Sequence, residues 1–180
     1  MTIRPVQANA ASALLGLSLL SWPATALADS TAAFCQLSRH DHTIAVESGP
    51  CSFSQRQGNV TVHMGQRWAF RFNANEQGTG YQRENREEGI RFTRDGDYTL
   101  SVYWPRALQC QGPIKAPVSV VYLNQAEPRR AALAVGDQHV LLPIAPSGSG
   151  ARYSGSGVEL WEHQGTTQIN WRGQNLVCNS

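Results

Sequence analysis

Short runs of alternating apolar and polar residues, separated by tight turns, constrain this fold more than any other feature. In residues 67–72, the aromatic side chains of Trp68, Phe70 and Phe72 alternate with the polar Arg67 and Arg71 and the small Ala69, which is the period of a half-buried strand. Asp95-Gly96 and Gly136-Asp137 each lie between two such runs, as the turns of β-hairpins do. No segment after residue 28 shows a convincing helical period. The pattern therefore predicts an all-β protein of the sandwich or barrel type.

The predicted strands form two groups on either side of Pro105, which stops a strand because proline cannot donate to a ladder. Within the first group, polar residues 73–88 are predicted to form a long loop. Strands are expected in the first group at residues 43–46, 60–64, 67–72, 90–94 and 98–104, and in the second at residues 118–123, 131–135, 138–144, 158–161, 166–172 and 174–178. We therefore predict a separate small β-rich domain at residues 29–106 and a second β domain at residues 107–180.

The N-terminus has the pattern of a cleavable signal peptide. Residues 11–22 are nearly continuously apolar, and residues 26–28 have the sequence Ala-Leu-Ala of a cleavage site. The apolar run is too short for a membrane-spanning helix, which takes about 20 residues. The first cysteine, Cys35, does not follow the cleavage site, so a lipid-attachment motif is not expected. We expect residues 1–28 to be removed and the mature protein to be periplasmic, without a membrane anchor.

The chain has four cysteines, and an even number in an exported protein indicates disulfide bonds. Three connectivities are possible. We favour Cys35–Cys51 and Cys110–Cys178, because each pair then lies within one half of the chain. In the chain-entropy model, the shorter loop contributes about 3 kcal/mol to stability and the longer one about 4–5 kcal/mol. The cysteine spacings do not match the C-x₂₋₄-C spacing of metal sites.

Charge and motifs argue against several classes of function. The formal net charge of +2 gives no strong field for nucleic acid or an acidic membrane. Ser147 and Ser149 lie in a Gly/Ser loop that lacks the nucleophile-elbow pattern of a hydrolase. His40, Asp41 and His42 form the densest group of metal-ligand types. His40 and His42 could share one face of a strand, but no third ligand accompanies these two, so we expect a solvated loop. We expect no enzyme activity, no metal, no cofactor and no nucleic-acid partner.

One set of motifs in the second half resembles a known family. A Ser-Gly-x-x-Tyr segment, a following Trp and a turn that ends in Gly are typical of the membrane-bound and periplasmic inhibitors of c-type lysozyme. In that family, the turn has the sequence Trp-x-Lys-Gly, and a cysteine near the start of the domain pairs with one at its end. The match covers about residues 110–178 and rests on Leu141, Leu142, Pro143, Ser149, Gly150, Tyr153, Leu160, Trp161, Gly165 and Cys178.

The resemblance implies an eight-stranded antiparallel barrel that inserts two loops into the lysozyme cleft. A lysozyme uses one protonated and one ionised carboxyl group, so a hydroxyl and a cation would complement its active site. By position, Ser149 takes the hydroxyl role and the family's lysine falls at His163. Trp161 is expected to pack in the barrel core. The residues expected to bind c-type lysozyme are Ser149, Gly150, Arg152, Tyr153 and His163.

The turn after Trp161 departs from the family pattern, because residues 161–165 read Trp-Glu-His-Gln-Gly, one residue longer and with His for Lys. An ordinary imidazole is mostly uncharged at pH 7, and Arg152 is an alternative cation.

The first half lies outside the resemblance and could position the inhibitor, bind envelope glycan or extend the lysozyme contact. We predict a periplasmic inhibitor of c-type lysozyme. The alternative is a periplasmic β module with the same barrel that binds another envelope protein or a glycan.

Overall fold

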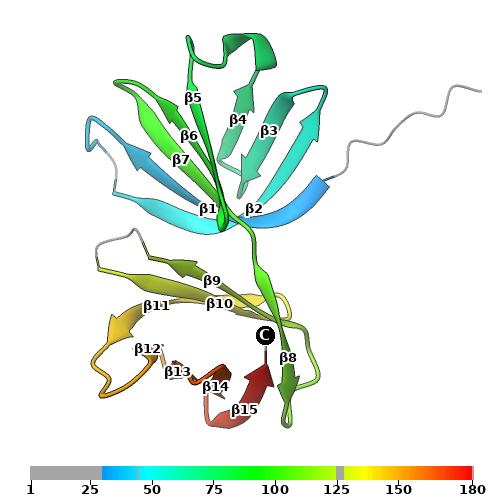
Figure 1. Cartoon of the computed structure of the whole chain (residues 1–180), viewed down its shortest axis with the longest axis vertical. Coiled ribbons are helices and arrows are strands. Elements are labelled where there is room, and N and C mark those ends of the chain that lie inside the picture. Colours follow the sequence, from blue (N-terminus) through cyan, green and yellow to red (C-terminus); the bar gives the residue numbers. More distant parts are fainter. Residues whose placement is uncertain (1–29, 44, 125–127, 180) are drawn as a thin grey trace, which may run out of the picture.

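The computed structural model describes residues 30–43, 45–124 and 128–179, which form two antiparallel β structures (Figure 1). The fifteen strands confirm the predicted all-β class. Within these ranges, the single helical element is a 3₁₀ turn, η1 (Ala74–Glu76). The predicted signal peptide, residues 1–28, lies outside the described residues.

The N-terminal sheet contains seven strands and is strongly curved (Figure 1). These are β1 (Ser30–Arg39), β2 (Glu47–Arg56), β3 (Asn59–Met64), β4 (Trp68–Phe72), β5 (Gln82–Arg86), β6 (Gly89–Arg94) and β7 (Tyr98–Tyr103). Their order across the sheet is β4-β3-β2-β1-β7-β6-β5, so β4 and β5 are the two edges. The curvature brings Phe72 of β4 onto Phe92 of β6, with their ring centroids 4.1 Å apart. Both side chains are fully buried, so an aromatic core fills the concave face.

The C-terminal half forms a closed barrel of eight strands, as predicted. The strands are β8 (Arg106–Gln111), β9 (Val118–Leu123), β10 (Arg130–Val135), β11 (Gln138–Ala145), β12 (Ala151–Gly155), β13 (Val158–His163), β14 (Thr166–Trp171) and β15 (Gln174–Asn179). Consecutive strands pair from β8 to β15, and β15 then pairs with β8 to close the barrel. Its interior is filled by alternate apolar side chains, including the fully buried Leu133, Leu142, Leu160 and Leu176.

Each half contains one disulfide, with the connectivity favoured from the sequence. Cys35 on β1 is bonded to Cys51 on β2. Cys110 on β8 is bonded to Cys178 on β15, across the seam where the first and last strands of the barrel meet. Each bond therefore links two neighbouring strands of its own half.

An apolar contact joins the curved sheet to the outer wall of the barrel. Phe34 on β1 and Tyr103 on β7 cluster with Val121, Leu123 and Ala132 of the barrel. All five are at most 6% exposed. Figure 1 shows β1 and β7 next to the β9–β10 side of the barrel. This contact fixes how the N-terminal sheet sits beside the barrel. The division into domains at residues 106 and 107 stays a prediction about independent folding.

The structure corrects several strand predictions. Residues 43, 45 and 46 are not in a strand, whereas β1, β2, β8 and β12 were not predicted. In β1 the alternation is hidden because Phe34 is buried on the face opposite Cys35 and Leu37, where it contacts the barrel. The predicted loop at residues 73–88 contains η1 and β5, a charged edge strand with no buried side chain.

Candidate functional site

Two connections lie side by side at one end of the barrel. Residues 146–150 join β11 to β12, and Gln164 and Gly165 form the turn between β13 and β14. Because Ala151 pairs with Glu162, Gly150 lies against the end of β13. A Cβ atom on Gly150 would lie 2.1 Å from the carbonyl oxygen of Glu162, and the residue has a φ of 69°. Glycine therefore allows the loop to approach the neighbouring turn this closely.

The loop is also held by a hydrogen bond from the strand beside it. The indole N–H of Trp161 donates to the carbonyl oxygen of Ser149 at 3.0 Å, and the Ser147 hydroxyl donates to the same oxygen at 2.6 Å. The Ser149 hydroxyl itself has no hydrogen-bond partner among the described residues, and Ser149 is exposed. The backbone of this loop is thus fixed while its hydroxyl stays available to a ligand.

The turn geometry changes which residue is at the tip of the second connection. Gln164 and Gly165 both have positive φ, 49° and 78°, as in a two-residue type I′ turn. His163 is the last residue of β13 and pairs with Thr166. Its imidazole stacks on Trp161, with ring centroids 5.3 Å apart. Counted back from the glycine, Gln164 occupies the position before Gly that Lys has in Trp-x-Lys-Gly, a position that the sequence prediction assigned to His163.

The structure gives two aromatic residues roles different from those expected. Trp161 was predicted to lie in the barrel core, but it is on the face of β13 opposite the buried Val158 and Leu160. Tyr153 is 3% exposed and packs in the core against Tyr122, with ring centroids 5.6 Å apart. Burial raises the pKa of Tyr153, so it stays a neutral phenol at physiological pH. Tyr153 therefore supports the loop from inside the barrel.

Arg152 is engaged on the outer wall of the barrel. Its guanidinium forms an ion pair with Glu159 on the neighbouring strand, and this hydrogen bond raises the pKa of Arg152. The two side chains are 44% and 40% exposed, so the pair is accessible to solvent. As an alternative cation, Arg152 would have to leave a carboxylate that already neutralises it.

A polar cluster that sequence reasoning missed lies at the mouth of the barrel. Arg106 contacts Glu162 at 3.2 Å and donates to the Tyr122 hydroxyl at 3.4 Å. Burial and the hydrogen bond with Glu162 raise the pKa of Tyr122. Val158, Leu160 and Glu162 are each two residues apart, so they share one face of β13, and this spacing was the signal that the Glu162 side chain points inward. The cluster lies directly behind the turn, because Glu162 precedes His163.

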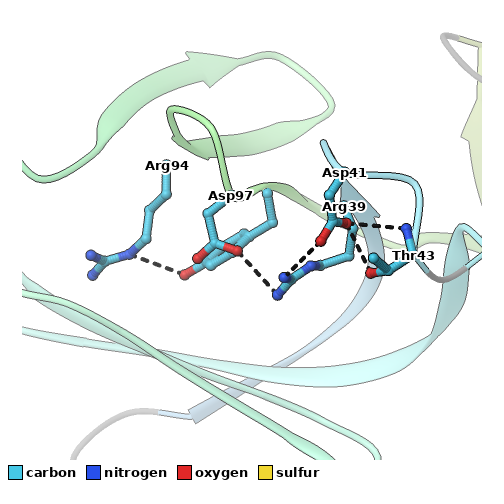
Figure 2. Close-up of polar contacts among 6 residues, drawn as sticks. Arg39, Asp41, Thr43, Arg94 and Asp97 are labelled. Atoms are coloured by element: carbon cyan, nitrogen blue, oxygen red, sulfur yellow. Dashed lines mark hydrogen bonds and ion pairs between the residues drawn. The ribbon is translucent and has the colours of Figure 1, made fainter.

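A second polar cluster lies on the N-terminal sheet, at the start of β7 (Figure 2). Arg39 contacts Asp97 at 3.0 Å and Asp41 at 3.4 Å. The amide and hydroxyl of Thr43 donate to Asp41, and these bonds lower the pKa of its carboxyl group. The cluster ties the β1–β2 connection to the β6–β7 turn, which gives Asp41 a structural role.

Within the described ranges, no group of three or more His, Cys, Asp or Glu side chains is arranged to hold a metal.

Comparison with known proteins supplies a family for the second half. Residues 109–177 match the model of the family described as membrane-bound lysozyme-inhibitor of c-type lysozyme. Lipoprotein LprI of Mycobacterium tuberculosis and that of Mycobacterium bovis are each 38% identical over 64 residues, which is 36% of this chain and 32% of theirs. The chain thus covers about a third of the length of these curated relatives. No solved structure gives a significant match.

The matched segment and the barrel coincide closely. The match begins within β8 and ends within β15, so it includes both connections and Cys110, and it ends one residue before Cys178, the other cysteine of the barrel disulfide. The matching family is one of inhibitors. None of the helices in the described part of the chain is long and apolar enough to cross a membrane. The C-terminal barrel therefore matches the family of membrane-bound lysozyme inhibitors of c-type lysozyme, and the resemblance seen in the sequence is confirmed for this half of the chain.

Proposed function

We propose that the protein is a periplasmic inhibitor of c-type lysozyme that blocks the enzyme's active-site cleft with residues 146–150 and the Gln164–Gly165 turn. The observation that carries this proposal is the adjacency of these two connections on a barrel that matches an inhibitor family. Together they form one surface at this end of the barrel, which is called the projection below. The active site of a lysozyme is a cleft, which such a projection can fill.

The chemistry of the projection supports a contact with carboxyl groups. The exposed Ser149 hydroxyl has no partner among the described residues, so it can donate to an ionised carboxylate. The Gln164 side chain can donate through its amide group, and it brings no charge. A hydrogen bond to a charged group contributes about 1.5–3 kcal/mol, which is enough for each donor to matter.

Replacing Ser149 with alanine is expected to weaken inhibition about tenfold to a hundredfold, because a donor to a charged group is lost. The measurement is the inhibition constant in a lysozyme lysis assay with purified mature protein. Ser154→Ala is the matched control, since Ser154 lies on β12, away from the projection, and its hydroxyl also has no partner among the described residues. If the wild type inhibits no c-type lysozyme at micromolar concentration, the alternative of a β module for another envelope protein or glycan is favoured.

Gln164→Lys is expected to strengthen inhibition at neutral pH by about tenfold, since it places a cation at the tip of the turn, where the family has lysine. The backbone cost is unchanged, because glutamine already adopts the positive φ at this position. His163→Lys is the matched comparison and is expected to have the smaller effect, because residue 163 is in the strand and stacked on Trp161. The opposite ranking of the two inhibition constants would put the lysine position at residue 163.

A further inference from the structure

A groove lies between the N-terminal sheet and the barrel, next to the barrel mouth. Its volume is about 450 Å³, which is within the usual range of ligand pockets. Glu87 and Glu88, from the β5–β6 turn, and Trp104, after β7, line one side. Arg106 and Tyr122 line the barrel side. The groove is thus formed jointly by the half that matches the inhibitor family and the half that does not.

The walls of the groove are held in place by the fold. The amide of Trp104 donates to the carbonyl oxygen of Glu88 at 3.0 Å, which ties the acidic turn to the end of β7. The indole of Trp104 packs edge-on against Phe53, with ring centroids 5.2 Å apart. Immediately before Trp104, Tyr103 takes part in the apolar contact between the sheet and the barrel. These contacts hold Trp104 and the acidic turn in place beside the barrel, so the walls of the groove are ordered before a ligand binds.

The chemistry of the groove favours a cationic side chain. Glu87 is exposed, and its carboxylate has no ion-pair partner among the described residues. The cation already in the groove, Arg106, is engaged by Glu162 and lies over the Tyr122 ring. The exposed lip is therefore acidic, while aromatic rings form part of the walls. An arginine or lysine can lay its apolar stem and charged end along such walls and reach the carboxylates.

The groove is continuous with the projection formed by the two connections. Arg106 lines the groove and contacts the Glu162 side chain. The carbonyl oxygen of Glu162 lies directly against Gly150. A partner that covers the projection would therefore extend over the mouth of the groove. We propose that the groove receives an arginine or lysine side chain of the same lysozyme, so that the N-terminal sheet is a second contact surface. This inference rests on the proposed function.

The test is the affinity of the full-length mature protein for a c-type lysozyme, measured by surface plasmon resonance at about 50 and about 150 mM salt. Glu87→Gln/Glu88→Gln is expected to weaken binding about fivefold to tenfold and to flatten the salt dependence, mainly through a slower association rate. Asp137→Asn is the matched control, because Asp137 is an exposed acid in the β10–β11 turn, at the opposite end of the barrel. It is expected to bind like the wild type.

The outcomes separate the inference from the proposed function. If the wild type binds lysozyme and Ser149→Ala weakens it, but the double glutamine variant binds as the wild type does at both salt concentrations, the groove is not a contact surface. If the wild type binds no c-type lysozyme, the proposed function fails and the inference fails with it. Should the double variant have a lower melting temperature, Glu87→Gln alone decides the matter, since Glu87 is exposed and without an ion pair among the described residues.

Discussion

Replacing both Cys110 and Cys178 with alanine is expected to lower the free energy of unfolding of the barrel by about 4–5 kcal/mol, according to the chain-entropy model. The two residues are 68 positions apart, so the bond removes much of the freedom of the unfolded chain. It also lies at a seam of the barrel where the strands are paired over a short length. Strand β8 pairs with β15 over residues 109–111 alone and with β9 over residues 106–108. Without the bond, β8 is expected to detach first.

Hydrogen exchange followed by mass spectrometry can measure this effect strand by strand, together with urea unfolding. The variant is expected to lose protection in β8 and β15 first, while β1 and β7 keep theirs. Cys35→Ala/Cys51→Ala is the matched control, with an expected loss of about 3 kcal/mol, because its loop is shorter. Its strands, β1 and β2, remain paired over residues 30–37. Equal barrel protection in the wild type and in the Cys110/Cys178 variant would contradict the expectation.

The barrel could be predicted from the sequence because most of its strands have one buried face. Strands such as β13 and β14 alternate between core and surface, and two-residue turns separate them from the strands that follow. This pattern fixes both the strand and its inward face. In the N-terminal half the pattern is obscured where a second face is buried. Phe34 belongs to the contact with the barrel, so β1 has buried residues in succession and lacks a period of two.

Part of the candidate site could be predicted from the sequence, because a motif consists of residues that are close together in the chain. The exact ends of the strands and the pairing between them depend on the whole fold. The Ser-Gly-x-x-Tyr segment located the first connection, and the glycine at residue 165 located the second. Which residue occupies the tip of the turn depends on where β13 ends, and one additional residue moves that place from His163 to Gln164. Arg106 could not be associated with Glu162 from the sequence, since they are 56 residues apart and meet only when the barrel closes.

The position of Trp161 shows that the alternation of residues along a strand can predict which side chains face the core. Val158 and Leu160 are apolar and two residues apart, so the period of two assigns Trp161 to the other face of the strand. We predicted a core position for Trp161, and this was wrong. On the outer face, Trp161 donates to the Ser149 carbonyl and so links the two connections. Its polar N–H explains why an aromatic side chain is useful at this place.

Gly150→Ala is expected to lower the free energy of unfolding by about 2–4 kcal/mol, the range of mutations that strain the backbone and introduce a clash. The new Cβ would lie 2.1 Å from the carbonyl oxygen of Glu162, and backbone atoms cannot yield as a flexible side chain can. The positive φ adds about 1–2 kcal/mol for a residue with a Cβ. The loop must then move away from β13, which breaks the bond between Trp161 and Ser149.

Substitutions at two other glycines separate the effect of the steric clash from the cost of the positive φ. Gly148 is in the same loop, does not have a positive φ, and has open space where a Cβ would lie, so Gly148→Ala is expected to be neutral. Gly157 has a φ of 72° and also has open space around a Cβ, so Gly157→Ala reports the conformational cost alone. We expect inhibition to weaken about tenfold or more for Gly150→Ala, measured well below its melting temperature, and to be unchanged for the other two. If Gly150→Ala keeps full inhibition, the close approach of the loop to the turn is not required, because the projection then works without it.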